Sequence, residues 1–283
     1  MYDIKKCSQV SDSIIYKAFT DGFADYMIHV EMDEDFFINR FFGQEGNDRE
    51  LSFIAFKEDK PVGITLGGIK YGENFKTLRC GGMSIIPSER GTGLANELMG
   101  YYESEARKIG CKQLFLEVIN GNDRAINFYK KIGYEKVYDL TYRKLELTGD
   151  NPIKNITMND IEVEEMTYED ISSLREIDFS HLPWQADFPY FKNLSCRYYG
   201  IEDKNKIVAG IVASDNRLIY LWVHPNYRNK GYAKVLLNKV IDDLKPDELN
   251  VMYSNNSQAH TFANYLKMKM KEFGQYEMYK LLL

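Results

Sequence analysis

A glycine-containing segment suited to binding phosphate occurs twice in this chain of 283 residues. The two copies, residues 87–95 and 225–233, each follow an apolar run and lead into an amphipathic pattern. Glycine lets the backbone turn tightly and approach a ligand closely, and free amides at the start of a helix attract an anion. We call these segments the first cradle and the second cradle. Each is predicted to hold a pyrophosphate.

The two cradles repeat at a fixed offset. Gly231 follows Gly93 by 138 residues, and Arg228 follows Arg90 by the same 138 residues. A single copy could be an ordinary turn between a strand and a helix, whereas self-similarity at a fixed offset is typical of duplicated units. The sequence therefore predicts a duplicated domain.

The length agrees with two domains, each large enough to close its own core. We predict an N-terminal, catalytic domain over residues 1–147 and a C-terminal, degenerate domain over 159–283. Residues 148–158 lose periodicity and collect turn residues, so they are predicted to be a linker.

Hydrophobic periodicity predicts the elements of each domain. In the first domain, helices are expected at 11–26, 33–42, 94–109 and 124–132, and strands at 51–57, 62–70, 79–86, 113–118 and 137–147. In the second, strands are expected at 161–166, 197–202, 207–214 and 218–223, and a helix at 171–178. The inward residues of the helix after the first cradle are expected to be Leu94, Leu98, Tyr101 and Ala106.

Two motifs carry a resemblance to a known family. The pattern Arg-x-x-Gly-x-Ala of both cradles resembles the acetyl-CoA loop of the GNAT acyltransferases. Residues 122–134 match that family's Asn-x-x-Ala-x-x-Phe-Tyr-x-x-x-Gly-Phe/Tyr segment, in the family's order. The resemblance covers residues 79–147. It implies an α/β (α+β) fold of two tandem GNAT-like domains, each a mixed, mostly antiparallel sheet flanked by helices, with acetyl-CoA as cosubstrate.

The resemblance also implies which residues bind coenzyme A. In the first domain they are Met83, Ser84, Ile85, Ile86, Arg90, Gly91, Thr92, Gly93, Leu94, Ala95, Asn122, Phe128 and Tyr129. A second cofactor site would use Val223, Arg228, Asn229, Lys230, Gly231, Tyr232 and Ala233. Asn122 suits either a hydrogen bond to the pantetheine chain or a helix cap. Arg90 suits either positioning of phosphate or ordering of the loop.

The strand at residues 114–118 resembles that of the ribosomal-protein alanine N-acetyltransferases. In those enzymes the matching glutamate is the general base and the tyrosine twelve residues later is the general acid, which assigns Glu117 and Tyr129 here. The alternatives are structural. Glu117 alternates with its apolar neighbours and could be a solvent-facing carboxylate, and Tyr129 could pack a helix against the sheet.

Attack of an amine on a thioester is assisted by both a general base and a general acid. An amine with a pKa near 10.4 is only about one part in 10³ to 10⁴ neutral at pH 7, a deficit of about 4 to 5 kcal/mol. A base removes the proton as the nitrogen attacks a thioester, backbone amides of Met83, Ser84 and Ile85 can stabilise the oxyanion, and an acid protonates the departing thiolate.

The second copy lacks this pair. Aligning its helix motif by Ala259 and Phe262 puts Val251 in place of Glu117, Ala263 in place of Tyr129 and Lys267 in place of Gly133. The C-terminal domain is therefore predicted to bind coenzyme A without turnover, to wall the acceptor cleft, or simply to stabilise the first domain.

An acceptor site is expected in the aromatic-rich stretches 19–32 and 36–42. The polar residues there that could attract an amine are Asp25, Tyr26, His29, Glu31 and Glu34. A charged helix face explains the same residues. Nothing in the sequence names the acceptor.

Composition limits the other functions. With a net charge of −6 and no basic stripe, nucleic acid is not expected as a partner. No apolar run approaches the roughly 20 residues needed to span a bilayer, and the N-terminus lacks the apolar core of a signal peptide, so a cytoplasmic protein without a membrane partner is expected. The cysteines Cys7, Cys80, Cys111 and Cys196 show no metal-ligand spacing, so reduced buried thiols and no metal are expected.

These observations together predict an acetyl-CoA-dependent N-acetyltransferase that acts on a primary amine of a small molecule, peptide or protein. A homodimer is compatible with this prediction. Two alternatives remain open at this stage. One is a transferase of another acyl group, and the other is a coenzyme-A-binding sensor or scaffold with little turnover.

Overall fold

A computed structural model describes residues 1–28, 31–71, 74–147, 161–192 and 194–282. The chain forms two compact units, one of residues 1–137 with 276–283 and the other of residues 138–275. The predicted linker at 148–158 lies outside the described residues.

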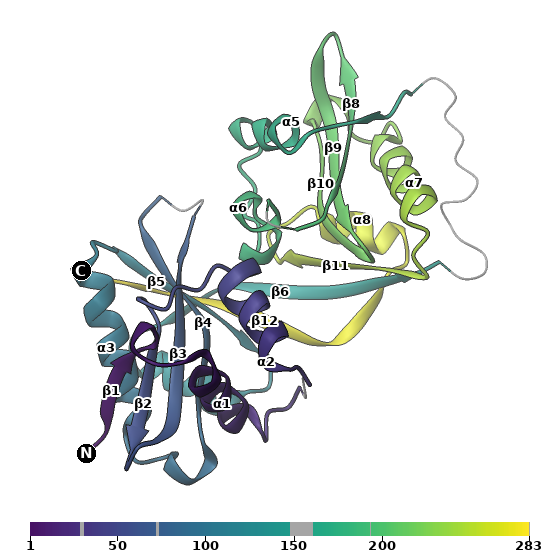
Figure 1. The fold of residues 1–283 in the computed structure, drawn as a ribbon. Helices are drawn as coiled ribbons and strands as arrows, with labels where there is room; N and C mark the ends of the chain where they lie inside the picture. The colour runs from purple at the N-terminus through teal and green to yellow at the C-terminus, as the bar shows by residue number, and fades with distance from the viewer. Residues whose placement is uncertain (29–30, 72–73, 148–160, 193, 283) are drawn as a thin grey trace. The chain divides into compact units, whose positions relative to one another are not determined.

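The first unit is built on a sheet with the order β1-β2-β3-β4-β5-β12 (Figure 1). Neighbouring strands from β1 to β4 are antiparallel, whereas β4 and β5 are parallel. The strands are β1 (Asp3–Lys6), β2 (Phe53–Lys57), β3 (Lys60–Lys70), β4 (Thr77–Ile85), β5 (Gln113–Ile119) and β12 (Lys269–Leu281), the last contributing its C-terminal residues. The sheet is therefore mixed and mostly antiparallel, as predicted.

Helices build an apolar core on each face of this sheet. The helices α1 (Asp12–Phe23) and α2 (Glu34–Ile38) pack on one face with residues of β2 and β3. The helices α3 (Leu94–Lys108) and α4 (Asp123–Lys131) contribute to the core on the other face, together with β4 and β5. These two layers hold the ends of β4 and β5, where the cradle and the predicted catalytic residues lie.

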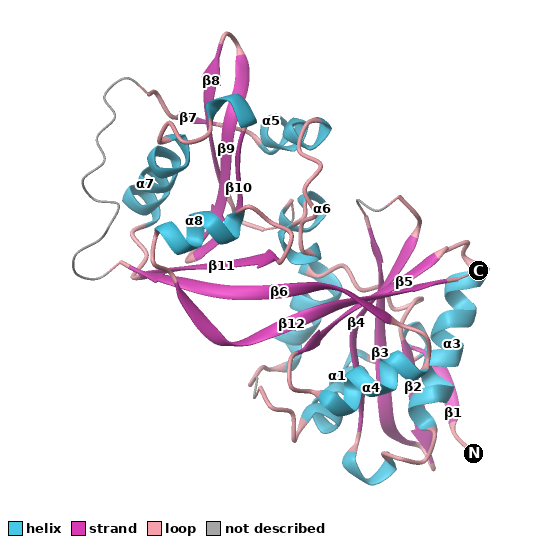
Figure 2. Ribbon diagram, turned by 180° about the vertical axis from the view of Figure 1, so that it is seen from behind, coloured by secondary structure: helices cyan, strands magenta, loops and turns pink. Residues whose placement is uncertain are grey.

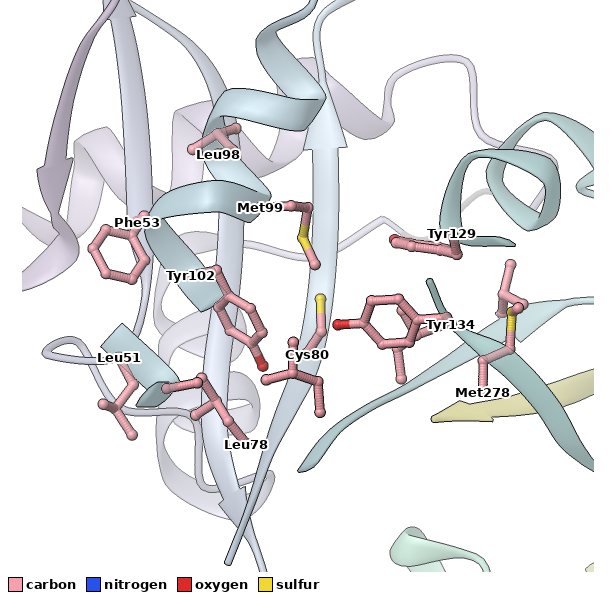
Figure 3. Packing of buried hydrophobic residues seen from close by; sticks show 14 of the residues in the cluster. Leu51, Phe53, Leu78, Cys80, Leu98, Met99, Tyr102, Tyr129, Tyr134 and Met278 are labelled. Carbon is pink, nitrogen blue, oxygen red and sulfur yellow. The ribbon is translucent and has the colours of Figure 1, made fainter. Parts of the chain in front are cut away.

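One residue of α3 was predicted wrongly. Tyr101 was expected to face the core but is 48% exposed, while Tyr102 is fully buried. The inward row runs through Leu94, Leu98, Tyr102 and Ala106, a strict spacing of four residues. Figure 3 shows Leu98 and Tyr102 of this row. The predicted helix at 33–42 is also divided, because α2 ends at Ile38 and a π-helix follows it at Asn39–Gln44.

The second unit repeats this plan with the strand order β6-β11-β10-β9-β8-β7 (Figure 2). Its strands are β6 (Glu135–Glu146), β7 (Glu164–Glu165), β8 (Arg197–Asp203), β9 (Lys206–Ser214), β10 (Arg217–Val223) and β11 (Glu248–Ser254). Its helices are α5 (Tyr168–Ser173), α6 (Phe188–Phe191), α7 (Tyr232–Leu244) and α8 (Ala259–Tyr265). Again only the pair β10 and β11 is parallel among the pairs for which the register is seen.

Each unit closes its sheet with a strand from the other half of the sequence. In the first unit, Met278 and Leu282 of the C-terminal segment join the core beneath α3. In the second unit, residues 140–146 of β6 pair antiparallel with β11. The boundaries between the two compact units therefore lie between residues 137 and 138 and between residues 275 and 276.

Candidate active site

The strands β4 and β5 separate at their C-terminal ends. Their parallel register runs from Thr77 opposite Gln113 to Cys80 opposite Leu116 and goes no further, while β4 stays paired with β3 up to Ile85. A β-bulge at residue 81 marks the point of separation. Residues 81–85 therefore have one backbone edge that is not paired with β5, which is the arrangement expected for a strand that offers amides to a ligand.

The first cradle follows β4 directly. A 3-10 turn, Pro87–Glu89, leads to Gly91 and Gly93, whose φ angles of +78° and +95° favour glycine. The amides of residues 91–95 donate no hydrogen bond to any described residue. A Cβ at either glycine would meet no atom within 4 Å, so open space lies over these amides. The arrangement can bind an anion at the start of α3.

Arg90 orders this loop. Its Nε donates to the Ile85 carbonyl at 2.8 Å, and its Nη2 donates to the Gly22 carbonyl at 3.1 Å. Nη2 also donates to Asp25 Oδ1 at 2.6 Å, and this contact holds the pKa of the Asp25 carboxyl below its usual value. Of the two roles considered for Arg90, the geometry favours tying the end of α1 to the cradle.

Tyr129 lies in α4 beside the separated end of β4. The side chain is buried, and its hydroxyl donates to Met83 Sδ at 3.8 Å. Its ring packs edge-on against Tyr134 with centroids 5.7 Å apart, and Figure 3 shows both rings together near Cys80. Burial raises the pKa of the Tyr129 phenol well above its usual value, so the hydroxyl keeps its proton at neutral pH. It can act as a proton donor.

Glu117 lies on β5 just beyond the point of separation. Its neighbours Leu116 and Val118 are buried in the core on the α3 side, so the half-buried Glu117 points to the opposite face. Burial lowers the pKa of the Arg79 guanidinium, and the negative charges of Glu45 and Glu117 oppose that effect. The carboxylate is thus partly shielded from solvent and lies in the field of a buried arginine.

Asn122 caps α4, as one of its two predicted roles required. Its side-chain oxygen accepts a hydrogen bond from the Ala125 amide at 3.2 Å. Burial raises the pKa of Tyr26, and a hydrogen bond with the Asn122 side chain counteracts that rise. Tyr26 therefore lies at the N-terminus of α4, while the predicted acceptor residue His29 lies outside the described residues.

The other predicted cofactor residues of the first unit surround the same loop. Thr92 and both glycines are exposed, and the Leu94 side chain is buried beneath the cradle, so only its backbone can reach a ligand. Ser84 and Ile85 are buried, and the half-buried positions are Met83, Ile86, Arg90, Ala95, Asn122 and Phe128.

The second cradle has the same backbone geometry. Gly231 precedes α7 with a φ of +88°, and Asn229 takes the left-handed conformation of Gly91 with a φ of +62°. The amides of residues 229–233 donate no hydrogen bond to any described residue. Arg228 Nε donates a hydrogen bond to the Val223 carbonyl at 2.9 Å. Arg90 Nε of the first cradle likewise donates to the carbonyl five residues earlier, that of Ile85. Lys230, Tyr232 and Ala233 belong to this loop or to the first turn of α7.

The helix α8, which follows β11, agrees with the alignment of Ala263 with Tyr129 and of Lys267 with Gly133. The Met268 amide bonds to the Ala263 carbonyl at 3.0 Å, as the Tyr134 amide bonds to the Tyr129 carbonyl at 3.0 Å. Ala263 therefore occupies the position of Tyr129, and Lys267 takes the left-handed conformation of Gly133, with a φ of +54°.

The strand register moves the residue that corresponds to Glu117 in the second unit by one position from the alignment given above. Arg217 of β10 is opposite Asn250, as Arg79 of β4 is opposite Phe115. Two residues further along β11, Met252 rather than Val251 matches Glu117. The second unit therefore presents an apolar side chain at the position of the predicted base.

A buried carboxylate that the sequence reasoning missed lies on the strand next to β5. The Leu282 amide donates to the Lys112 carbonyl at 2.9 Å, and the rings of Phe115 and Tyr279 lie 4.9 Å apart. Both contacts fit one antiparallel register, which puts Glu277, fully buried, opposite Glu117. No local sequence signal could have revealed this pairing, because the two residues are 160 positions apart.

The described residues contain no group of three or more histidine, cysteine, aspartate and glutamate side chains able to hold a metal ion. All four cysteines are free, and Cys196 is only half-buried where full burial was expected. Among the described residues, no helix combines the length and the apolar character needed to cross a membrane.

Comparison with known proteins agrees with the geometry. The model of the acetyltransferase (GNAT) family matches residues 15–134 and again residues 161–266. An acetyltransferase of Pectobacterium atrosepticum is 32% identical over 98 residues, which is 35% of this chain and 67% of that protein. Streptothricin acetyltransferase of Streptomyces lavendulae is 30% identical over 93 residues, which is 32% of this chain and 49% of that enzyme. The match thus spans about half the length of the streptothricin enzyme.

Two solved structures share the whole two-unit fold. A GCN5-related N-acetyltransferase from Sphaerobacter thermophilus has a TM-score of 0.71 at 13% identity, with 99% of this chain and 95% of that chain covered. A tandem GNAT protein from the clavulanic acid biosynthesis pathway has a TM-score of 0.69 at 11% identity, with 99% and 98% covered. Since the family model matches both halves of the sequence, the chain belongs to the acetyltransferase (GNAT) family and contains two GNAT units in tandem.

Proposed function

We propose that this protein is an acetyl-CoA-dependent N-acetyltransferase with its active site in the first unit. The observation that carries the proposal is the spatial order of three functional groups along the C-terminal ends of β4 and β5. Free amides of the first cradle, the unpaired edge of residues 81–85 and the buried hydroxyl of Tyr129 follow one another there. The second unit has the cradle without the hydroxyl.

In this proposal the amides of residues 91–95 bind the pyrophosphate of coenzyme A. Arg90 contributes indirectly, since its guanidinium is already hydrogen-bonded to Ile85, Gly22 and Asp25. The pantetheine arm then runs along the unpaired edge of β4, where the amides at Met83, Ser84 and Ile85 can stabilise the oxyanion of the tetrahedral intermediate.

Direct attack by the acceptor amine in a ternary complex completes the reaction. Glu117, directly or through a water molecule, takes the proton that the nitrogen loses as it bonds to the thioester carbon. When the carbon–sulfur bond breaks, the electron pair goes to sulfur, and the Tyr129 hydroxyl supplies the proton to the thiolate. Proton exchange with solvent then restores both residues.

The acceptor is proposed to be a primary amine of a small molecule or of a peptide. Asp25, which the sequence suggested as an acceptor residue, is paired with Arg90. Tyr26, by contrast, lies beside Asn122 at the start of α4 and is the better candidate for an acceptor contact.

The proposal is tested by release of free thiol from acetyl-CoA against a panel of amines, peptides and aminoglycoside-like antibiotics. Once an acceptor is found, Glu117→Gln should lower turnover by about 10² to 10⁴ with acetyl-CoA affinity little changed. Glu135→Gln, at an exposed carboxylate at the start of β6, is the matched control and should retain full activity.

A coenzyme-A-binding sensor remains the second candidate, favoured by the loss of both catalytic positions in the second unit. Tight binding of acetyl-CoA without thiol release for any acceptor would select it. Turnover with one acceptor, lost in Glu117→Gln, would exclude it.

A further inference from the structure

A network of polar side chains from other segments forms hydrogen bonds with Glu89 and Thr92 of the first cradle. The Tyr2 hydroxyl donates to Glu89 Oε2 at 2.7 Å and lies 2.9 Å from Thr92 Oγ1. Lys57 Nζ donates to Glu89 Oε1 at 2.8 Å, and Thr92 Oγ1 donates to the Glu89 carbonyl at 2.7 Å. The network thus joins the first residues of the chain, the end of β2 and the cradle itself.

The second unit has a contact in the same place made with different chemistry. The Tyr227 hydroxyl, at the position of Glu89, donates to the Asp203 carboxylate. Asp203 precedes the hairpin turn of Lys204 and Asn205, just as Lys57 precedes a turn with two residues at positive φ. The end of the hairpin is therefore fastened to the turn before the cradle in both units, and only the first unit does so with an ion pair.

The ion pair has a consequence for an anionic ligand. The hydrogen bonds from Lys57 and Tyr2 hold the pKa of the Glu89 carboxyl below its usual value, so this group is negatively charged at neutral pH. A single hydroxyl group separates that carboxylate from the Thr92 side chain of the cradle. An uncompensated negative charge so close to the amides would oppose a pyrophosphate.

We propose that Lys57 and Tyr2 are positioning residues for the pyrophosphate, since both hold Glu89 beside the cradle and the Lys57 ammonium offsets the charge of the Glu89 carboxylate. This inference rests on the proposed function of the first cradle. In this proposal Lys57 acts through its contact with Glu89, and Tyr2 acts through its contacts with Glu89 and Thr92. Their effect should be seen in the KM for acetyl-CoA and not in kcat.

The test compares Lys57→Met with Lys60→Met, which removes the same charge from an exposed lysine of the same hairpin. Lys57→Met should raise the KM for acetyl-CoA by about fivefold, the effect expected of one partly screened charge, while Lys60→Met should leave it unchanged. The double variant Lys57→Met/Glu89→Gln should return KM to the value of Glu89→Gln alone, because the opposing charge is gone.

A donor without pyrophosphate separates charge from general damage to the loop. With S-acetyl-pantetheine as donor, Lys57→Met should have the KM of the wild type, and Tyr2→Phe likewise. A rise of KM for this short donor, or no rescue in the double variant, would overturn the proposed role even if thermal melts show that all variants fold.

The outcome also distinguishes this inference from the proposed function. If Gly93→Glu abolishes acetyl-CoA binding while Lys57→Met behaves like Lys60→Met, the positioning role is wrong and the cradle assignment stands. If Gly93→Glu leaves binding unchanged, the cradle assignment itself is wrong.

Discussion

Gly22 of α1 lies directly against Ser84 of β4. A Cβ built on Gly22 would come within 2.2 Å of Ser84 Oγ and 2.7 Å of Ser84 Cβ. This close approach sets the depth at which α1 packs on the sheet. It also brings the Gly22 carbonyl and Asp25 to the Arg90 guanidinium, so the position of the cradle depends on a residue at which only hydrogen fits.

Replacing Gly22 by alanine should therefore reverse the usual effect of this substitution in a helix. Glycine to alanine within a helix normally stabilises by about 0.5 to 1 kcal/mol. Here the clash with Ser84 should destabilise by about 1 to 3 kcal/mol and raise the KM for acetyl-CoA. Gly100→Ala in α3, where a Cβ would meet no atom within 4 Å, is the control and should stabilise. Urea denaturation measures both.

The two cradles should be inequivalent in turnover. Gly93→Glu and Gly231→Glu place the same side chain at the same position, with φ angles of +95° and +88°, so their backbone strain is matched. We expect Gly93→Glu to abolish acetyl transfer and Gly231→Glu to spare it. Isothermal titration calorimetry with acetyl-CoA would show whether the second cradle binds at all, and the reverse pattern of activity would move the active site to the second unit.

Tyr129→Phe removes a proton donor while keeping the ring in the core. Turnover should fall by about 10² or more, with a smaller loss for acyl donors whose thiolate leaves easily. Tyr134→Phe is a close control, because Tyr134 is also buried in this cluster and burial likewise raises the pKa of its phenol. If both variants lose activity equally under rate-limiting chemistry, packing rather than proton transfer explains the effect.

Stability should fall at alkaline pH. Burial raises the pKa of Tyr102, Tyr129 and Tyr134 well above the value near 10 of an unfolded chain. The folded state therefore keeps these protons when the unfolded state begins to lose them, so this stability is fully present below about pH 10 and is lost as pH rises further. Thermal melts from pH 7 to 11 should show a plateau and then a decline that is shallower in Tyr134→Phe. An identical slope in that variant would contradict the assignment.

The C-terminal strand should contribute strongly to the core of the first unit. Met278 is fully buried, so Met278→Ala should cost about 2 to 5 kcal/mol. Met270, on the same strand but 67% exposed, should change stability by less than about 0.5 kcal/mol when replaced by alanine. Denaturation curves monitored in parallel with acetyl-CoA binding would show whether the loss falls on the first unit.

The local part of the fold was predictable from the sequence. The turns that form the two cradles and most strands of the sheet follow from periodicity and turn residues, and the structure confirms them. The strand predicted at 161–166 was too long, since only Glu164–Glu165 forms a strand. Its apolar residues, including Ile161 and Val163, pack on the core without joining a ladder.

The non-local part could not be predicted. Nothing in the residues around Glu117 indicates that Glu277 lies opposite, and the network of Tyr2, Lys57 and Glu89 joins three segments of the chain. Such contacts depend on strand order, which a hydrophobic pattern does not encode. The sequence could suggest which groups are candidates for the chemistry, but not what surrounds them.

The membership of residues 276–283 in the first unit has a consequence for synthesis of the protein. A domain usually folds as a unit once its residues have been made. Here residues 138–275 must be synthesised before Met278 and Leu282 can enter the core of the first unit. The unit whose synthesis starts first therefore cannot be completed until the residues of the second unit have been made.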